Sequence, residues 1–97
     1  MTRRFALLAG LLVAGCGSGG GTPEHQFVSL GCAACHTLKA ADAHGSRGPN
    51  LDDRRPSVAE VERQVADGGG GMPSFKSRLS AKEIHALAVY VAGAAGS

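Results

Sequence analysis

Three residues of this chain have the types and spacing to hold a metal-containing ring: Cys32, Cys35 and His36 in the segment Cys32-Ala33-Ala34-Cys35-His36. Residues three and four apart lie on one face of a helix, so both thiols and the imidazole can point at one object. Thiols at this spacing form thioethers with the two vinyl groups of a haem, and the histidine that follows binds the iron. The segment therefore predicts one covalent haem c, attached through Cys32 and Cys35 and ligated by His36.

Other chemistries use the same five residues, and each needs its own context. A thioredoxin-type redox pair follows a strand in a βαβ unit, and no such pattern precedes Cys32. A structural zinc site needs four ligands, usually supplied as two close pairs. His25, His44 and His85 have no paired spacing, and we expect them to be surface residues. A disulfide between the two cysteines is the third alternative.

The second axial ligand of such an iron must come from elsewhere in the chain. A thioether sulfur is suitable because it raises the reduction potential of the iron. Apart from the initiator, Met72 is the only methionine, and it follows four consecutive glycines outside any apolar helical repeat. Glycine permits positive φ and a close approach of the backbone to a flat ligand. We predict Met72 as the second ligand; the alternative is a methionine that fills a gap in the core.

Helix start and stop signals predict three helices that could position these residues. The first starts with Pro23 at its first position, and the other two start with capping boxes at Ser57 and Ser80. The segments between these helices show no strand alternation and are read as loops. Loops this long in a small domain are usually functional or disordered. The helices are expected from Thr22 towards Cys32, between Ser57 and Gly68, and from Ser80 to just before Gly93, and the long loops at 37–56 and 68–79.

The length and charge of the chain limit what it can be. Residues 23–97 suffice for one small domain, and domains of this size usually need a disulfide, a metal or a bound group to complete their core. The chain has no Trp, one Tyr and three Phe. Arg3 and Arg4 account for two of its ten basic residues, and the other eight balance eight acidic ones. In the absence of a basic stripe or an aromatic platform in the sequence, nucleic acid is not expected as a partner.

Residues 1–15 have the features of a secretory signal, with Arg3 and Arg4 ahead of an apolar run at 5–14. That run is too short to cross the roughly 30 Å hydrocarbon core of a bilayer as a helix. Val13-Ala14-Gly15-Cys16 resembles a bacterial lipobox, which implies a lipid on Cys16 after cleavage; the alternative is an ordinary signal that leaves a free thiol. We therefore expect a lipoprotein signal peptide at 1–15, the lipidated Cys16 with a Gly-rich tether at 16–22, and a folded domain at 23–97.

Three segments occur in a fixed order along that domain: Gly31-Cys32-Ala33-Ala34-Cys35-His36-Thr37-Leu38, then Gly48-Pro49-Asn50-Leu51, then Gly71-Met72-Pro73-Ser74-Phe75. Together they resemble the class I cytochrome c family, close to its small bacterial monohaem members, over most of residues 23–95. The resemblance implies an all-α class I cytochrome c fold, with three main helices and long loops wrapped around one covalent haem.

The same resemblance implies roles for further residues. The carbonyl of Pro49 should accept a hydrogen bond from the non-ligating nitrogen of His36, and Leu51 should pack on the haem. The first and last helices should cross, with Phe27 meeting Leu87 and Tyr90. The family often places a Trp or Tyr near a haem propionate, and no Trp, Tyr or Phe lies between Cys35 and Met72. Candidates for that role by charge are Arg47, Arg54 and Arg55, which could equally be solvated loop residues.

A haem iron with both axial positions filled by His36 and Met72 favours one-electron transfer without enzymatic chemistry. We expect a monomeric carrier between respiratory-type redox proteins of one membrane, a donor and a terminal acceptor such as an oxidase. Its expected place is the outer face of the bacterial cytoplasmic membrane, or the periplasmic side of an envelope membrane. The alternatives are a haem c subunit of a larger oxidase or dehydrogenase complex, and a ligand-binding haem sensor or peroxidase.

Overall fold

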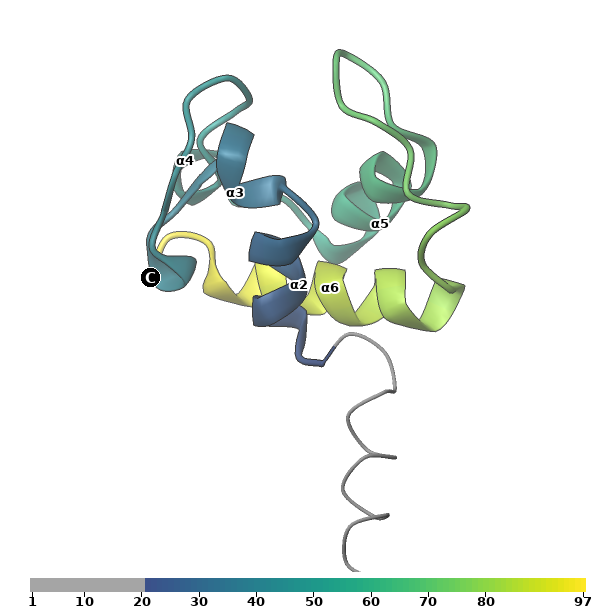
Figure 1. Cartoon of the computed structure of the whole chain (residues 1–97). Helices are drawn as coiled ribbons and strands as arrows, with labels where there is room; N and C mark the ends of the chain where they lie inside the picture. The colour runs from purple at the N-terminus through teal and green to yellow at the C-terminus, as the bar shows by residue number, and fades with distance from the viewer. Residues whose placement is uncertain (1–20) are drawn as a thin grey trace, which may run out of the picture.

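Two helices, α5 (Val58–Asp67) and α6 (Ala81–Ala94), pack against each other more extensively than any other pair of elements in the computed structural model, which describes residues 21–97 (Figure 1). Each starts with a complete capping box, in which a serine side chain and a glutamate side chain three residues later bond to each other's backbone N–H. These bonds satisfy N–H groups that have no partner inside the helix. Both predicted helix starts are confirmed. The helix α6 continues through Gly93 to Ala94, beyond its predicted end, because Ala94 still packs against the core.

The first helix, α2 (Pro23–Ser29), lies across α6 (Figure 1). It starts at Thr22, whose hydroxyl accepts a hydrogen bond from the backbone N–H of His25. The ring of Phe27 meets that of Tyr90 edge to face at 6.4 Å between centroids, and Phe27 belongs to the same buried cluster as Leu87. The expected crossing of the first and last helices is confirmed.

The helix predicted to run on to Cys32 is interrupted. It ends at Ser29, and the chain turns at Gly31 with φ +94°, a conformation that glycine adopts without steric cost. A separate single turn, α3 (Cys32–Cys35), follows. The break allows α3 to leave the direction of α2 and to stand above it (Figure 1).

The loop predicted at 37–56 contains short elements of its own: β1 (Thr37–Leu38), the 3₁₀ turn η1 (Lys39–Ala41), β2 (Ala43–His44) and α4 (Leu51–Arg54). The antiparallel strands pair Thr37 with His44 and Leu38 with Ala43. Strands of two residues are too short to produce a visible alternation in the sequence. Burial of Leu38 and Ala43 fixes this loop against the rest of the domain.

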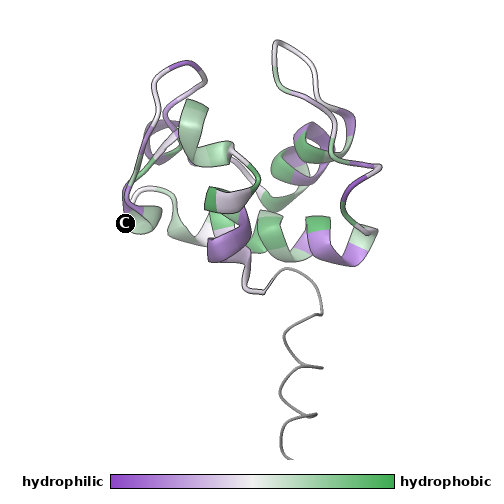
Figure 2. Cartoon of the chain, viewed as in Figure 1, coloured by the Kyte–Doolittle hydropathy of each residue, from purple (hydrophilic) through white to green (hydrophobic). Residues whose placement is uncertain are grey.

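Apolar residues of α2, α5 and α6 belong to one buried cluster, the core. Figure 2 shows hydrophobic (green) segments on all three helices. The buried apolar residues are Phe27, Leu38, Ala41, Ala43, Val61, Val65, Phe75, Leu79, Ile84, Leu87, Ala88 and Val91.

Within residues 21–97, no helix has the length and apolar character needed to cross a bilayer.

Asp52 joins three separate parts of this fold. Its carboxylate accepts hydrogen bonds from the backbone N–H of Lys39 at 2.9 Å and from that of Gly96 at 2.8 Å. These N–H groups, that of Gly96 foremost, hold the pKa of Asp52 below its usual value of 3.8. The carboxylate therefore stabilises the fold while it is ionised, and that contribution disappears as the pH falls through the lowered folded-state pKa.

Asp52→Asn is therefore expected to lower the free energy of unfolding at neutral pH. The loss should shrink towards zero as the pH falls below 3.8, because the wild-type carboxyl then becomes neutral too. Urea unfolding of the holoprotein at several pH values measures this difference. Asp53→Asn is the matched control at an exposed position of the same helix, and an equal loss in both variants would contradict the role of Asp52.

Candidate functional site

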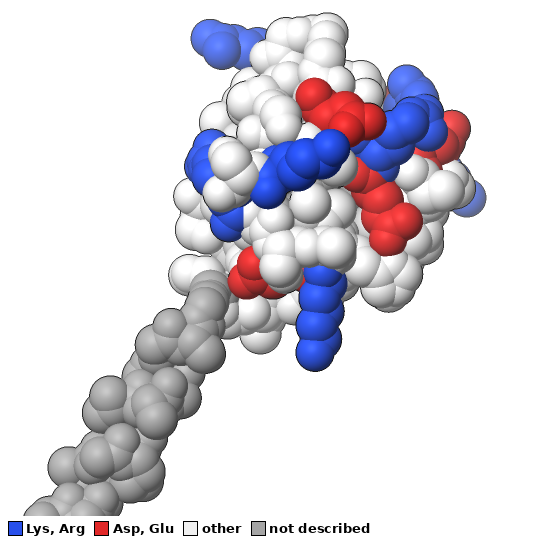
Figure 3. Space-filling view, turned by 90° about the vertical axis from the view of Figure 1, so that its right-hand side faces the viewer, with Lys and Arg blue, Asp and Glu red and all other residues white. Residues whose placement is uncertain are grey.

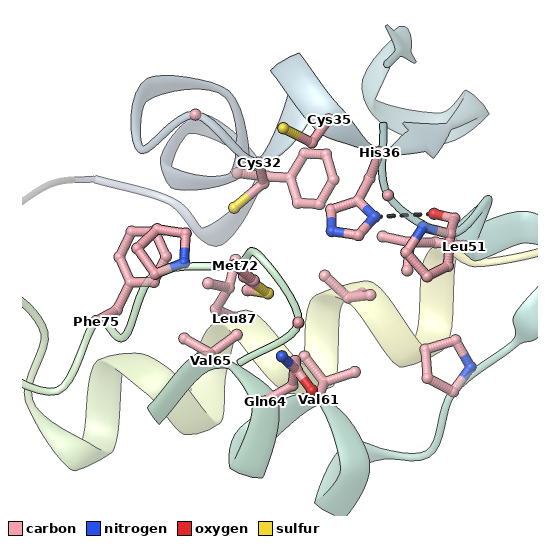
Figure 4. A pocket seen from close by; sticks show the side chains of 18 of the residues that line it. Cys32, Cys35, His36, Leu51, Val61, Gln64, Val65, Met72, Phe75 and Leu87 are labelled. Carbon is pink, nitrogen blue, oxygen red and sulfur yellow. Dashed lines mark hydrogen bonds between the residues drawn. The ribbon is translucent and has the colours of Figure 1, made fainter. Parts of the chain in front are cut away.

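The residues predicted to bind haem line one cavity of about 670 Å³ (Figure 4). This volume lies within the range of about 300–1,000 Å³ that is usual for ligand sites. In Figure 4, Cys32 and Cys35 on α3 are at one edge of the cavity, and Val61 and Gln64 on α5 are at the opposite edge. His36, Leu51 and Met72 lie between these edges. Residues separated by up to 40 positions are thus brought together.

The ring of His36 is held in one orientation. Its Nδ1 donates a hydrogen bond to the carbonyl oxygen of Pro49 at 2.8 Å, the contact that the resemblance implied. With the proton on Nδ1, the Nε2 atom keeps its lone pair and can bind a metal, and the carbonyl makes it a stronger donor. The backbone N–H of Gly48 also donates to the carbonyl of Cys35 at 2.7 Å, which ties this segment to α3.

Gly48 lies directly against the imidazole. A Cβ atom at this position would be 2.5 Å from Cε1 and 2.8 Å from Nδ1 of His36. Gly48→Ala should therefore displace the ring, weaken its bond to Pro49 and destabilise the holoprotein by about 1–3 kcal/mol, as overpacking usually does. Thermal unfolding and the visible absorption spectrum measure both effects. Gly93→Ala is the control, because its added Cβ meets no atom within 4 Å, and equal behaviour of the two variants would contradict the prediction.

Cys32 and Cys35 are half-buried free thiols. Burial raises the pKa of Cys32 to about 11, and its own backbone N–H and Arg78 lower it only in part. A redox-active pair requires the opposite, a thiol pKa lowered towards neutrality. Across residues 21–97, His, Cys, Asp and Glu side chains form no group of three or more that could hold a metal. The surroundings of the two thiols thus favour neither the thioredoxin-type nor the zinc alternative.

Met72 lies on a loop that is attached to α5 on both sides. Gly69 and Met72 exchange backbone hydrogen bonds of 2.8 and 3.1 Å. After Met72, the hydroxyl of Ser74 donates to the carbonyl of Ala66, and the N–H of the buried Phe75 donates to the carbonyl of Val65. Four successive positive φ values, from +63° to +119° at residues 68–71, make this tight return possible.

The other histidines do not line this cavity. His25, His44 and His85 are all exposed, as predicted. His44 pairs with Asp42, and His85 pairs with Glu62 of α5.

Two cavity residues, Arg63 and Gln64, were not identified from the sequence. Both are on α5, and the Nε2 atom of Gln64 donates to the carbonyl of Gly69 at 3.1 Å. The helical period provided a signal for Gln64, since it lies three residues after the inward-facing Val61. No such periodic signal points to Arg63. Of the arginines considered for the propionates, Arg47 and Arg54 line the cavity, whereas Arg55 packs against Gly96 instead.

The donor set fits a covalent haem. Two thiols, one imidazole with an available Nε2 and one thioether face a common space. The walls between them include the apolar side chains of Phe27, Leu51 and Leu87. Such a site can attach a ring at one edge, ligate its iron and surround it with apolar contacts.

Known proteins are similar to this chain in sequence and in fold. A family described as "Cytochrome C oxidase, cbb3-type, subunit III" matches residues 21–91, which include every residue of the cavity. Cytochrome c6 of Leptolyngbya boryana is 34% identical over 70 residues, which cover 68% of this chain and 82% of the relative. Cytochrome c6 of Limnospira maxima is 39% identical over 78 residues, covering 68% and 83%. The c-type cytochrome SorU from Sinorhizobium meliloti has 40% identity and a TM-score of 0.73, covering 77% of this chain and 88% of that one.

Proposed function

This chain belongs to the cytochrome c family as a small monohaem class I member, an electron carrier with covalent haem c, and from that premise we propose which of its residues bind the haem. Cys32 and Cys35 form the two thioethers. His36 through Nε2 and Met72 through its sulfur are the axial ligands. The observation that carries this assignment is that all four side chains line one cavity in which Pro49 orients the imidazole.

When bound, the haem iron alternates between its ferrous and ferric states and so carries one electron at a time. The chain's own residues determine how it does so. The Pro49 carbonyl fixes the tautomer of His36 and strengthens it as a donor. Leu51, Phe27 and Leu87 provide apolar walls that exclude water from the iron.

We propose that the carrier is tethered to a membrane through a lipid on Cys16. This residue and the signal peptide at 1–15 lie outside the described residues, and the proposal is supported by the lipobox-like sequence alone. Two or more acyl chains hold a protein at a bilayer far more durably than one. The composition of residues 17–21, Gly-Ser-Gly-Gly-Gly, is typical of linkers that keep a domain on the order of 10–15 Å from its attachment point. The domain at 23–97 then stays close to one membrane, on its outer or periplasmic side.

We propose redox proteins of that same membrane as donor and acceptor, with an oxidase as the terminal partner and the carrier itself a monomer. On the face seen in Figure 3, acidic and basic side chains are interspersed. The eight acidic residues and the eight basic residues beyond the signal also balance. Confinement to one membrane, rather than a strong overall field, would then bring the partners together.

The second candidate function is that of a haem c subunit in a larger oxidase or dehydrogenase complex. It is favoured by the matched family, whose description names an oxidase subunit. Purification from membranes in mild detergent separates the two functions. A free carrier elutes alone, whereas a subunit elutes with its complex.

Mass spectrometry of the mature protein purified from membranes tests the main proposal. We expect the mass of residues 16–97 plus one haem and the acyl chains, and the Cys16→Ser variant should retain haem but lose the acyl mass and the membrane association. A mass without haem would overturn the haem assignment. A mass with haem but without acyl chains would overturn only the tether.

A further inference from the structure

We propose that the outer face of α6 rests on the surface of the bilayer that holds the lipid anchor. This outer stripe consists of Lys82, His85, Ala86, Val89 and Gly93, which are all exposed. The proposal rests on the tether at Cys16 proposed above and adds a fixed orientation of the domain. With α6 on the lipid, the haem cavity faces away from the membrane.

The five residues follow one side of α6. Residues three, four and seven positions apart lie on the same side of a helix, and positions 82, 85, 86, 89 and 93 have this spacing. Val89, near the middle of the outer stripe, is 48% exposed. It is one of two large apolar side chains that the described residues leave open to solvent, the other being Val28 of α2.

The body of α6 separates the outer stripe from the haem cavity. Leu87 and Val91 are buried and line that cavity. Val89 is two residues from each of them, which places it roughly 160° around the helix. Figure 1 shows α6 running along the lower side of the domain, with α3 and α5 above it. The cavity and the outer stripe are therefore on opposite sides of the same helix.

The chain enters the domain beside the outer stripe. In Figure 1, the described chain leads into α2, which begins at Pro23, from below α6. Burial foremost, and then the charge of nearby Glu24, raise the pKa of Tyr90. Tyr90 borders the stripe, because it lies four residues after Ala86 and three before Gly93. The first turn of α2 is thus close to the stripe.

The short link to the anchor selects the bilayer as the surface that covers the stripe. Only residues 17–21 separate Cys16 from Thr22, and five residues span at most about 18 Å when fully extended. A domain of the length of residues 23–97 has a radius of gyration of about 11 Å and is roughly 30 Å across. The side around the attachment point therefore reaches the lipid, whereas the far side does not.

The side chains of the outer stripe suit a lipid surface. Ala86, Val89 and Gly93 are small or apolar and can lie against the headgroup region. The ammonium group of Lys82 can pair with lipid phosphates while its alkyl stem stays on the apolar surface. A short flexible link keeps the stripe at a millimolar effective concentration near the bilayer, so weak contacts of this kind are sufficient.

The carboxylates near the outer stripe are bound to other groups or lie at its rim. Glu62 of α5 pairs with His85. The carboxylate of Glu83 accepts a hydrogen bond from the backbone N–H of Ser80 at 2.8 Å, within the capping box. Glu24 lies beyond Tyr90, on α2. The stripe itself contains no acidic residue that would repel anionic lipids.

Acetylation by a membrane-impermeant reagent tests the contact. The lipidated holoprotein is bound to the outside of vesicles of phosphatidylethanolamine and phosphatidylglycerol, and the rates at its lysines are compared with those of the soluble Cys16→Ser variant. We expect Lys82 to react several-fold more slowly on the vesicles. Lys76, which pairs with Asp67 of α5 outside the stripe, should react equally fast in both settings.

The double variant Ala86→Glu/Val89→Glu places two carboxylates on the stripe at exposed positions. With and without Cys16→Ser, it should show equal rates at Lys82 on vesicles and in solution. Linear dichroism of the Soret band in oriented bilayers reports the orientation of the haem, and we expect dichroism in the wild type and its loss in this variant. Ala59→Glu, at an exposed position of α5, is the matched control and should behave as the wild type.

Equal rates at Lys82 in the wild type on vesicles and in solution, or the same dichroism in the double variant as in the wild type, would overturn the proposal. Protection of Lys82 in native membranes but not on lipid vesicles would also overturn it, because a protein partner would then cover the stripe. Failure of the tether is distinguishable, since the purified protein would then lack acyl mass and would not stay with the vesicles.

Discussion

Replacing Met72 with Ala is expected to lower the reduction potential of the haem and to open the iron to small ligands. The thioether stabilises the ferrous state, and axial ligands shift haem potentials over a total range of about 0.8 V. Met72 is the only thioether in the chain after the initiator, and it lines the same cavity as His36. The fall should therefore exceed that of any single surface-charge variant. Spectroelectrochemistry gives the potential, and the sulfur-to-iron charge-transfer band should disappear.

Two further variants isolate the effect of the sulfur. Met72→Leu preserves much of the volume and should lower the potential much as the alanine does, whereas Ser77→Ala, an exposed neighbour, should not. An unchanged potential would remove Met72 from the site. Rapid binding of cyanide or carbon monoxide by the unmodified protein at neutral pH, without the charge-transfer band, would favour the sensor or peroxidase alternative instead.

Removing both attachment points, in Cys32→Ala/Cys35→Ala, is expected to leave a chain that does not fold. The cavity of about 670 Å³ lies directly against the small core, with the buried Phe27, Leu87 and Val91 in its wall. Without the ring, water would reach these apolar side chains, at a cost of roughly 25 cal/mol for each Å² of apolar surface exposed. The total stability of a typical domain is only about 5–15 kcal/mol, so this exposure is expected to unfold a core as small as this one.

Far-UV circular dichroism and urea titration of the double variant measure this loss. Cys35→Ala alone retains one thioether and should hold haem with reduced stability, so it separates loss of the thiol from loss of the ring. A cooperative unfolding transition in the haem-free double variant would show that the core is sufficient without the cofactor.

The parts of the structure that were predictable depend on local signals. The capping boxes at Ser57 and Ser80 set the starts of α5 and α6, because those hydrogen bonds join residues only three positions apart. The parts that were not predictable depend on tertiary packing. The pairing of β1 with β2 involves only two residues on each side, and it is held by burial of Leu38 rather than by any sequence pattern.

The same division applies to the site. Cys32, Cys35 and His36 are adjacent in sequence, so their common target could be inferred from spacing. Arg54 and Arg55 could not be distinguished in this way. Arg54 lines the cavity, whereas the left-handed backbone at Arg55 directs that side chain towards Gly96. Arg63 joins the cavity only through the packing of α5.

The bonds that hold His36 and Met72, the two proposed axial ligands, have a consequence for the speed of electron exchange. The imidazole is fixed by Pro49, and the Met72 loop is fixed to α5 before and after the methionine, through Gly69 and Phe75. As axial ligands held in this way, the two residues would change their distances to the iron little between its oxidation states. The reorganisation energy would then be small, and an electron could move rapidly in either direction between partners whose potentials differ only slightly.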